Sequence, residues 1–137
     1  MHNSSDIHRG GCLCGNVRYV VAAPPLRSAI CHCRTCRKAA SSPTLPFVTF
    51  PAAAFSFERG TPQQFASSAD VVRTFCGDCG SPLTYANRAD LETIDVMTVS
   101  LDNPEDYPPE DHVWVSHKLE WDVIGDQLPS YPKGRTD

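Results

Sequence analysis

Seven cysteines in three tight groups constrain this chain of 137 residues more than any other feature. The groups are Cys-x-Cys at 12–14, Cys-x-Cys-x-x-Cys at 31–36 and Cys-x-x-Cys at 76–79. An odd number of cysteines cannot form a closed set of disulfides within one chain. Closely spaced thiols are typical of metal sites, because both sulfurs of a pair can reach the same ion. The spacing therefore predicts metal centres.

The seven thiols divide naturally into a set of four and a set of three. A structural zinc ion takes four protein ligands, whereas a catalytic zinc ion takes three and keeps one open position. This predicts a closed site made of Cys12, Cys14, Cys76 and Cys79, and an open site made of Cys31, Cys33 and Cys36. Spacing alone also allows other groupings. His32 could complete a four-ligand site with its cysteine neighbours, or these three thiols could hold no metal.

Two simpler explanations account for fewer of the cysteines. A lone Cys-x-x-Cys can be a redox pair, but that motif belongs to a βαβ context that this sequence lacks. Buried cysteines that only fill space would explain one or two thiols, and not three groups. We therefore expect zinc.

The frequent prolines and glycines indicate a mostly β fold. Twelve prolines and eight glycines leave no room for a long helix. Runs rich in β-branched and aromatic residues predict short strands at 17–22, 47–50, 55–57, 71–75, 83–85, 94–99 and 113–115. The segment 35–41 favours a helical turn, 90–93 a second short turn, and 102–111 an acidic loop. We expect a single, mostly antiparallel β domain over 9–131, with flexible ends at 1–8 and 132–137.

Charge and hydropathy exclude several classes of partner. Residues 1–38 carry six basic side chains and one acidic one, whereas residues 39–137 carry six basic and fifteen acidic ones. The acidic balance of this larger part would repel phosphates, so we expect no nucleic-acid partner. No apolar run is long enough to span a membrane, and the first ten residues lack the apolar core of a secretory signal. We expect a cytoplasmic protein with reduced thiols.

Basic side chains accompany the three-cysteine group. Arg34, Arg37 and Lys38 lie in the same segment and could lower the pKa of the thiols or bind the carboxylates of an anionic ligand. They could equally be a solvated face of a helical turn. His112 and His117 are candidate general acids by residue type, although such histidines more often pack beside aromatic side chains such as Trp114 and Trp121.

Three runs of sequence resemble the glutathione-dependent formaldehyde-activating enzyme family, which includes relatives of centromere protein V. They are GGCLCGNVRY at 10–19, CHCRTCRKAA at 31–40 and RTFCGDCGSPL at 73–83, and the likeness continues through 100–121 and 127–131. The resemblance implies a β-tent fold of stacked antiparallel sheets. It also implies a structural zinc on Cys12, Cys14, Cys76 and Cys79, and a second, more labile zinc on Cys31, Cys33 and Cys36, where the thiol substrate would bind.

The resemblance further implies a carbon–sulfur lyase. Its reaction would join glutathione, or a similar small thiol, to formaldehyde or another small aldehyde, as in S-hydroxymethylglutathione synthesis, or reverse that step. A non-catalytic, zinc-stabilised binding module is the alternative, and a DNA-binding zinc module ranks third.

Overall fold

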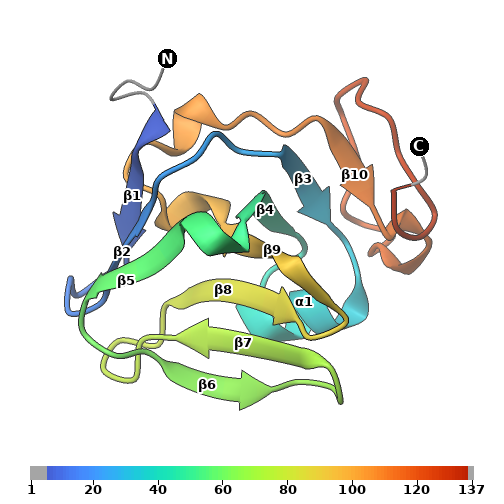
Figure 1. The fold of residues 1–137 in the computed structure, drawn as a ribbon. Coiled ribbons are helices and arrows are strands. Elements are labelled where there is room, and N and C mark those ends of the chain that lie inside the picture. Colours follow the sequence, from blue (N-terminus) through green and yellow to red (C-terminus); the bar gives the residue numbers. More distant parts are fainter. Residues whose placement is uncertain (1–5, 136–137) are drawn as a thin grey trace.

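Two β-sheets make up most of the structure, a computed structural model that describes residues 6–135 (Figure 1). The small sheet has the order β1-β2-β5 and the large sheet the order β10-β3-β4-β9-β8-β7-β6. All pairings are antiparallel except that of β10 with β3. The strands are β1 (His8–Gly11), β2 (Arg18–Val21), β3 (Arg27–Cys31), β4 (Leu45–Pro51), β5 (Phe55–Arg59), β6 (Gln63–Ala66), β7 (Val71–Phe75), β8 (Pro82–Asn87), β9 (Asp90–Met97) and β10 (Asp111–Val113).

Helical structure is short, as the prolines and glycines predict. The α-helix in the described part of the chain is α1 (Arg34–Ala40), close to the expected turn at 35–41. Four 3-10 turns are η2 (Ala52–Ala54), η3 (Thr98–Ser100), η4 (Pro104–Asp106) and η5 (Val115–His117). The described residues include no helix that is long and apolar enough to cross a membrane. The predicted fold class, a mostly β protein with one or two helical turns, is confirmed.

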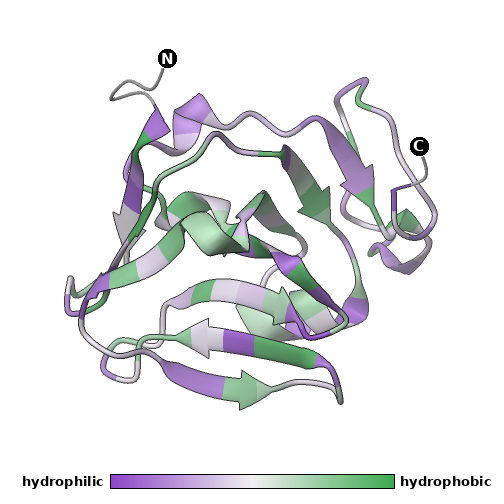
Figure 2. Cartoon of the chain, in the orientation of Figure 1, coloured by the Kyte–Doolittle hydropathy of each residue, from purple (hydrophilic) through white to green (hydrophobic). Residues whose placement is uncertain are grey.

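The core lies between the two sheets. Fully buried side chains from both sheets meet there, including Tyr19 and Val21 of β2, Phe50 of β4, Leu83 of β8 and Val96 of β9. A second cluster of buried residues beside α1 contains two of the cysteines, Cys31 and Cys36. In Figure 2 the edge strands β6 and β10 begin with hydrophilic residues, whereas β3 carries an apolar run inside the sheet. Polar side chains on the exposed strand β6 limit pairing with other chains, whereas the outer edge of β10 is covered by hydrogen bonds with residues 129–131.

Several predicted boundaries are wrong. The segment 90–93 is the beginning of β9 and not a helical turn, because the chain turns earlier, at Arg88 and Ala89. Residue 114 ends β10 with a left-handed backbone, so 114–115 are not strand. β4 begins at Leu45, before the predicted strand, and includes Pro46. Pro46 has no amide hydrogen to donate, but the strand accommodates it because pairing with β9 begins only at Phe47.

Three strands were not predicted: β1, β3 and β6. β1 reads His-Arg-Gly-Gly, and all four residues of β6 are exposed, so neither has the β-branched, alternating pattern of a half-buried strand. The expected flexible end at 1–8 includes His8, which lies in β1, and the end at 132–137 includes Lys133, whose carbonyl accepts a hydrogen bond from the Trp114 amide at 2.9 Å. The remainder of these ends, 1–5 and 136–137, lies outside the described residues.

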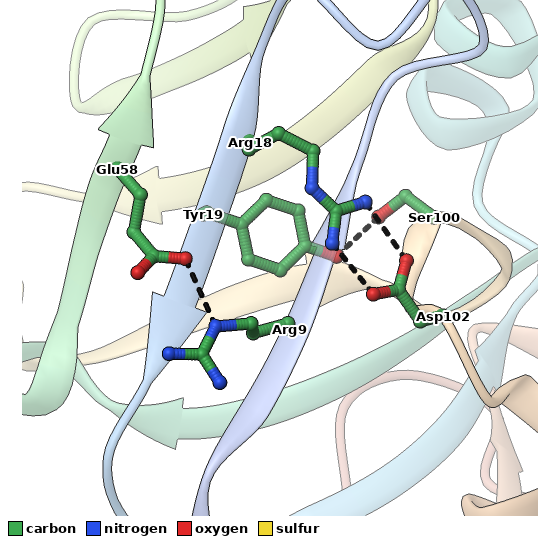
Figure 3. A network of polar contacts seen from close by, with 6 residues as sticks. All are labelled: Arg9, Arg18, Tyr19, Glu58, Ser100 and Asp102. Atoms are coloured by element: carbon green, nitrogen blue, oxygen red, sulfur yellow. Dashed lines mark hydrogen bonds and ion pairs between the residues drawn. The ribbon is translucent and has the colours of Figure 1, made fainter.

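Polar contacts fasten the small sheet to the segment that follows β9 (Figure 3). The buried Tyr19 hydroxyl is 2.6 Å from the Ser100 hydroxyl, and Arg18 donates to both carboxylate oxygens of Asp102 at 2.9 and 2.6 Å. Arg9 of β1 pairs with Glu58 of β5 at 3.1 Å. These contacts fix the β1–β2 hairpin, which carries the first cysteine pair at its tip.

Candidate metal centres and the cavity beside them

Four thiols meet at the tips of two hairpins. Cys12 and Cys14 lie in the turn between β1 and β2, and Cys76 and Cys79 lie in the turn between β7 and β8. The four sulfurs lie within 4.8 Å of one another. Because β1 and β2 belong to the small sheet and β7 and β8 to the large one, this cluster joins the two sheets.

The geometry of the four sulfurs fits a tetrahedral ion. The Cys12 and Cys14 sulfurs are 3.6 Å apart, and the Cys14 and Cys76 sulfurs are 3.7 Å apart. Zinc–sulfur bonds of about 2.3 Å give a tetrahedral edge of ~3.8 Å, close to both distances. No disulfide competes, since all seven cysteines are free thiols. The donor set therefore fits zinc.

Backbone amides support the sulfurs in both turns. Val17 N donates to the Cys12 sulfur at 3.3 Å, and Asp78 N donates to the Cys76 sulfur at 3.4 Å. Gly15 and Gly80 have φ values of +81° and +80°, a left-handed conformation that glycine adopts at little cost and that turns the chain after each pair. Such amide contacts stabilise thiolates.

Two polar links between the hairpin tips were not predicted. The Ser81 hydroxyl lies 3.3 Å from the Cys79 sulfur and accepts a hydrogen bond from Leu13 N at 3.0 Å. The hydrogen bond from Ser81 lowers the pKa of Cys79 to about 5. Asn16 Nδ2 donates to Asp78 at 3.0 Å across the same gap. The sequence offers one signal for these residues, their position next to the cysteine pairs.

The other three thiols form a separate cluster. Cys31 ends β3, Cys33 caps the N-terminus of α1, and Cys36 lies in the first turn of that helix. Their sulfurs lie within 4.8 Å of one another. Cys36 N donates to the Cys33 sulfur at 3.4 Å, and Cys33 N donates to the Cys31 sulfur at 3.5 Å. The division into four and three thiols is thus present in space.

The three thiols affect one another's pKa. Hydrogen bonds from the Cys31 and Cys36 thiols lower the pKa of Cys33, and the Thr35 hydroxyl, 3.4 Å from its sulfur, contributes in the same direction. The contacts with Cys33 and Cys36 raise the pKa of Cys31, which burial raises further. The thiolate is the form of cysteine that binds a cation.

A cavity of about 500 Å³ opens beside the three thiols, which form part of its wall. Its volume lies in the ordinary range for small-ligand sites. Apolar side chains line one part, including Phe47, Met97 and Trp114, and polar groups line the rest. Cations and anions both occur in the lining, namely Arg27, Arg73, Arg135, Asp90 and Asp95.

Arginines give the cavity a positive character near the thiols. Arg73 of β7 donates to the Cys36 sulfur at 3.8 Å, and its guanidinium lies 5.0 Å from the centre of the Tyr85 ring. Arg27 and Arg135 share the single buried carboxylate of Asp111, at 3.2 and 3.6 Å. The charge of Arg27 also acts on Asp95, so cations and carboxylates alternate in this part of the lining.

Asp95 is a half-buried residue whose carboxyl group lines the same cavity. It accepts a hydrogen bond from the Thr49 hydroxyl at 2.6 Å. Burial raises the pKa of Asp95 to about 6, and the Thr49 hydrogen bond and the charge of Arg27 only partly oppose this shift. Asp95 lies within a predicted strand, but no spacing in the sequence marked it as a functional residue.

The three basic residues of the cysteine segment, Arg34, Arg37 and Lys38, lie outside the cavity that contains the sulfurs. Arg37 donates to the backbone carbonyls of His32 and His117, at 3.3 and 3.1 Å. Arg34 and Lys38 line a neighbouring cavity of about 740 Å³. None of the three lines the cavity that contains the sulfurs.

The histidines form a chain behind the cluster rather than a part of the cavity. His32 Nε2 is 2.9 Å from His112 Nδ1, and His112 Nε2 is 2.9 Å from Asp126. His32 and His112 are both buried, and no histidine lines the cavity. The ring of His117 lies 5.2 Å from that of Trp114.

A two-sheet β domain with four thiols at its hairpin tips and three more in a cavity wall belongs to the cysteine-rich β proteins that can hold metal ions. More narrowly, the chain belongs to the family described as glutathione-dependent formaldehyde-activating enzyme, which it matches over residues 7–117. The predicted family is confirmed.

Two relatives extend this comparison. An uncharacterized lyase of Schizosaccharomyces pombe is 33% identical over 79 residues, which are 58% of this chain and 57% of that protein. The match thus spans little more than half of that relative. A crystal structure of a Rhodobacter sphaeroides protein has 26% sequence identity and a TM-score of 0.56, and the likeness covers 72% of this chain and 93% of the other.

Proposed function

We propose that this chain is a zinc-dependent carbon–sulfur lyase that acts on adducts of glutathione, or of a related small thiol, with formaldehyde. One observation carries the proposal: three thiols lie together in the wall of a cavity that is large enough for a small peptide. Membership of the formaldehyde-activating family supports the choice of glutathione and formaldehyde. Free thiols fit a reducing compartment, and we place the protein in the cytoplasm.

We assign different roles to the two sets of thiols. Cys12, Cys14, Cys76 and Cys79 would hold a structural zinc ion, since four thiolates leave no position open. Cys31, Cys33 and Cys36 would hold a second zinc ion, and one position would remain for the substrate sulfur. A zinc ion bound there would favour the thiolate form of a thiol, which is the nucleophile in the synthetic direction.

The residues of the chain would bind and orient the peptide. We assign the substrate carboxylates to arginines of the cavity lining, with Arg73 near the thiols as the first candidate and Arg27 and Arg135 as the others. In the direction of synthesis a bond forms between the thiol sulfur and the aldehyde carbon, and the carbonyl oxygen becomes a hydroxyl. The thiol proton is thus released and one proton reaches the oxygen, so the reaction is balanced without a further reagent.

Asp95 is the group that we assign to proton transfer. It lines the cavity, and with a pKa of about 6 it can hold or release a proton near neutral pH. Its hydrogen bond from Thr49 fixes one carboxylate oxygen. His112 and His117, the residues suggested by sequence, lie outside the lining and are not assigned this role.

Exchange spectroscopy by NMR with carbon-13 formaldehyde tests the proposal, because it measures formation of S-hydroxymethylglutathione above the spontaneous rate. We expect a rate increase that depends on enzyme concentration, two zinc ions per chain, and loss of both the increase and one zinc ion in Cys36→Ser. An unchanged exchange rate in Cys36→Ser would contradict the proposal. One zinc ion per chain, with no rate increase in the wild type, would indicate the non-catalytic module instead.

A further inference from the structure

A second cavity adjoins the one that contains the thiols. Its volume is about 740 Å³, and it lies among α1, β6, β7 and β8. Four residues line both cavities: Thr35, Leu45, Arg73 and Met97. Two of these four contact the sulfurs directly, Thr35 at Cys33 and Arg73 at Cys36. These four side chains therefore form the wall between the two cavities.

The lining of this cavity is mainly apolar, with cations among the exposed residues. Ala39 and Ala40 contribute from α1, Phe65 from β6 and Phe75 from β7. Arg34 and Lys38 are exposed members of the lining, and Arg73 lies toward the thiols. Among residues 6–135 no acidic side chain lines this cavity. An apolar lining of this kind suits a hydrocarbon group.

Formaldehyde has one carbon and no hydrocarbon group to bury, and the first cavity alone lies in the volume range that accommodates a small peptide ligand. We propose, resting on the lyase function above, that the second cavity binds the carbon chain of an apolar aldehyde. The substrates would then be glutathione adducts of apolar aldehydes of several carbons. The peptide would occupy the first cavity, the sulfur would lie at Cys31, Cys33 and Cys36, and the chain would extend past Thr35 and Met97.

The reaction on such an adduct needs no additional reagent. The carbon–sulfur bond of the thiohemiacetal breaks, the hydroxyl proton leaves, and the aldehyde carbonyl forms. The sulfur departs with the bonding electron pair and takes up a proton. Each methylene group of the aldehyde would contact the apolar lining while the adduct is bound, and would lose these contacts when the aldehyde is released. Chain length would therefore act mainly on binding.

Stable thioethers test the binding separately from the reaction. We expect S-hexylglutathione to bind at least tenfold more tightly than S-methylglutathione in isothermal titration calorimetry with the zinc-loaded protein. Ala39→Glu places a carboxylate in the apolar lining at an exposed helical position that tolerates glutamate. This variant should reduce the hexyl-to-methyl affinity ratio at least fivefold. The matched control Ala53→Glu, an exposed residue outside both linings, should keep the ratio.

Two results would overturn the inference: equal affinity for the two thioethers, or a ratio that Ala39→Glu leaves unchanged. Turnover distinguishes this failure from failure of the lyase function. We compare turnover of the glutathione adducts of formaldehyde and of hexanal. If the formaldehyde adduct is exchanged above the spontaneous rate but the hexanal adduct is exchanged no faster than it, the second cavity has been misassigned and the lyase function stands. If no adduct is exchanged but S-hexylglutathione still binds selectively, the lyase function fails and the binding site stands.

Discussion

Arg73, on strand β7, donates a hydrogen bond to the sulfur of Cys36, on helix α1, across 3.8 Å. The two residues are 37 positions apart, and the contact places a guanidinium beside a buried thiol. A cation at this distance stabilises the thiolate form, which is the form that binds metal. The contact thus links strand β7 of the large sheet to helix α1.

Replacing Arg73 should weaken metal binding at that cluster. In Arg73→Met the neighbouring positive charge is lost, and we expect the affinity of the second zinc ion to fall by about tenfold, or ~1.4 kcal/mol. Arg73→Lys, which keeps the charge, should recover part of the affinity. Competition with a chromophoric chelator measures the constant. Arg88→Met removes an exposed arginine that lines neither cavity and is the control; an equal loss there would contradict the prediction.

The two sets of thiols should respond differently to the same substitution. Cys76→Ser removes a thiol from the cluster that joins the two sheets, which we propose to hold a structural zinc ion, so we expect a fall in Tm of about 10 °C or more and a loss of zinc-dependent stability. Cys36→Ser alters a cluster within a six-residue segment, and its Tm should change much less. Differential scanning calorimetry with parallel zinc analysis makes the comparison. Similar Tm losses in both variants would contradict this division of roles.

Asp95 should make stability depend on pH. Its pKa is about 6 in the folded protein and 3.8 as the ordinary value, so the folded state holds the proton more tightly. Stability therefore falls as the pH rises from about 4 to 6, and the cost persists above that range. Asp95→Asn removes this cost and keeps an acceptor for Thr49. We expect its advantage over the wild type to grow by roughly 2 kcal/mol between pH 4.5 and 7.5.

Urea unfolding of both proteins across this pH range measures the difference, in which the effects of zinc release cancel. Thr49→Val is a useful comparison, because it removes the hydroxyl that lowers the pKa of Asp95 and should enlarge the pH dependence. A difference between Asp95→Asn and the wild type that does not vary with pH would show that Asp95 is charged throughout.

His112 should support the cysteine segment through His32. The two rings are 2.9 Å apart and both are buried, so His112→Phe leaves the Nε2 atom of His32 without its partner. We expect a loss of about 1–3 kcal/mol in the free energy of unfolding, and weaker binding of the second zinc ion. His112→Asn, which offers a shorter polar group, should lose less. Chemical denaturation and zinc competition measure the two effects; unchanged values in His112→Phe would refute the supporting role.

The sequence indicated the clustering of the thiols better than the lining of the cavity. The expected sets of four and three thiols are the ones that lie together in the structure; their role as metal ligands stays a prediction. The cavity is assembled from strands far apart in the chain, such as β3, β7 and β9, and the order of these strands in the sheet could not be read from propensity. The sequence therefore did not indicate Arg73 and Asp95 as cavity residues. It indicated Arg34, Arg37 and Lys38 instead, because they lie close to the cysteines in sequence.

Three strands were missed: β3 inside the large sheet and β1 and β6 at sheet edges. The polar edge strand β6 has no buried residue, and β1 contains two adjacent glycines. β6 pairs with β7 and β1 pairs with β2, and this backbone pairing determines that both are strands. Backbone pairing of this kind does not require a particular pattern of side chains in the sequence.

The separation of the cysteines along the chain also has a consequence for how the protein folds. Cys14 and Cys76 are 62 residues apart, so their cluster can assemble only after two distant hairpins have formed and met. Cys31, Cys33 and Cys36 span six residues and can capture an ion while the chain is still unfolded. Zinc available during synthesis would thus reach the local cluster early and the hairpin cluster last. The final step of folding would then be the closing of the two sheets on their ion.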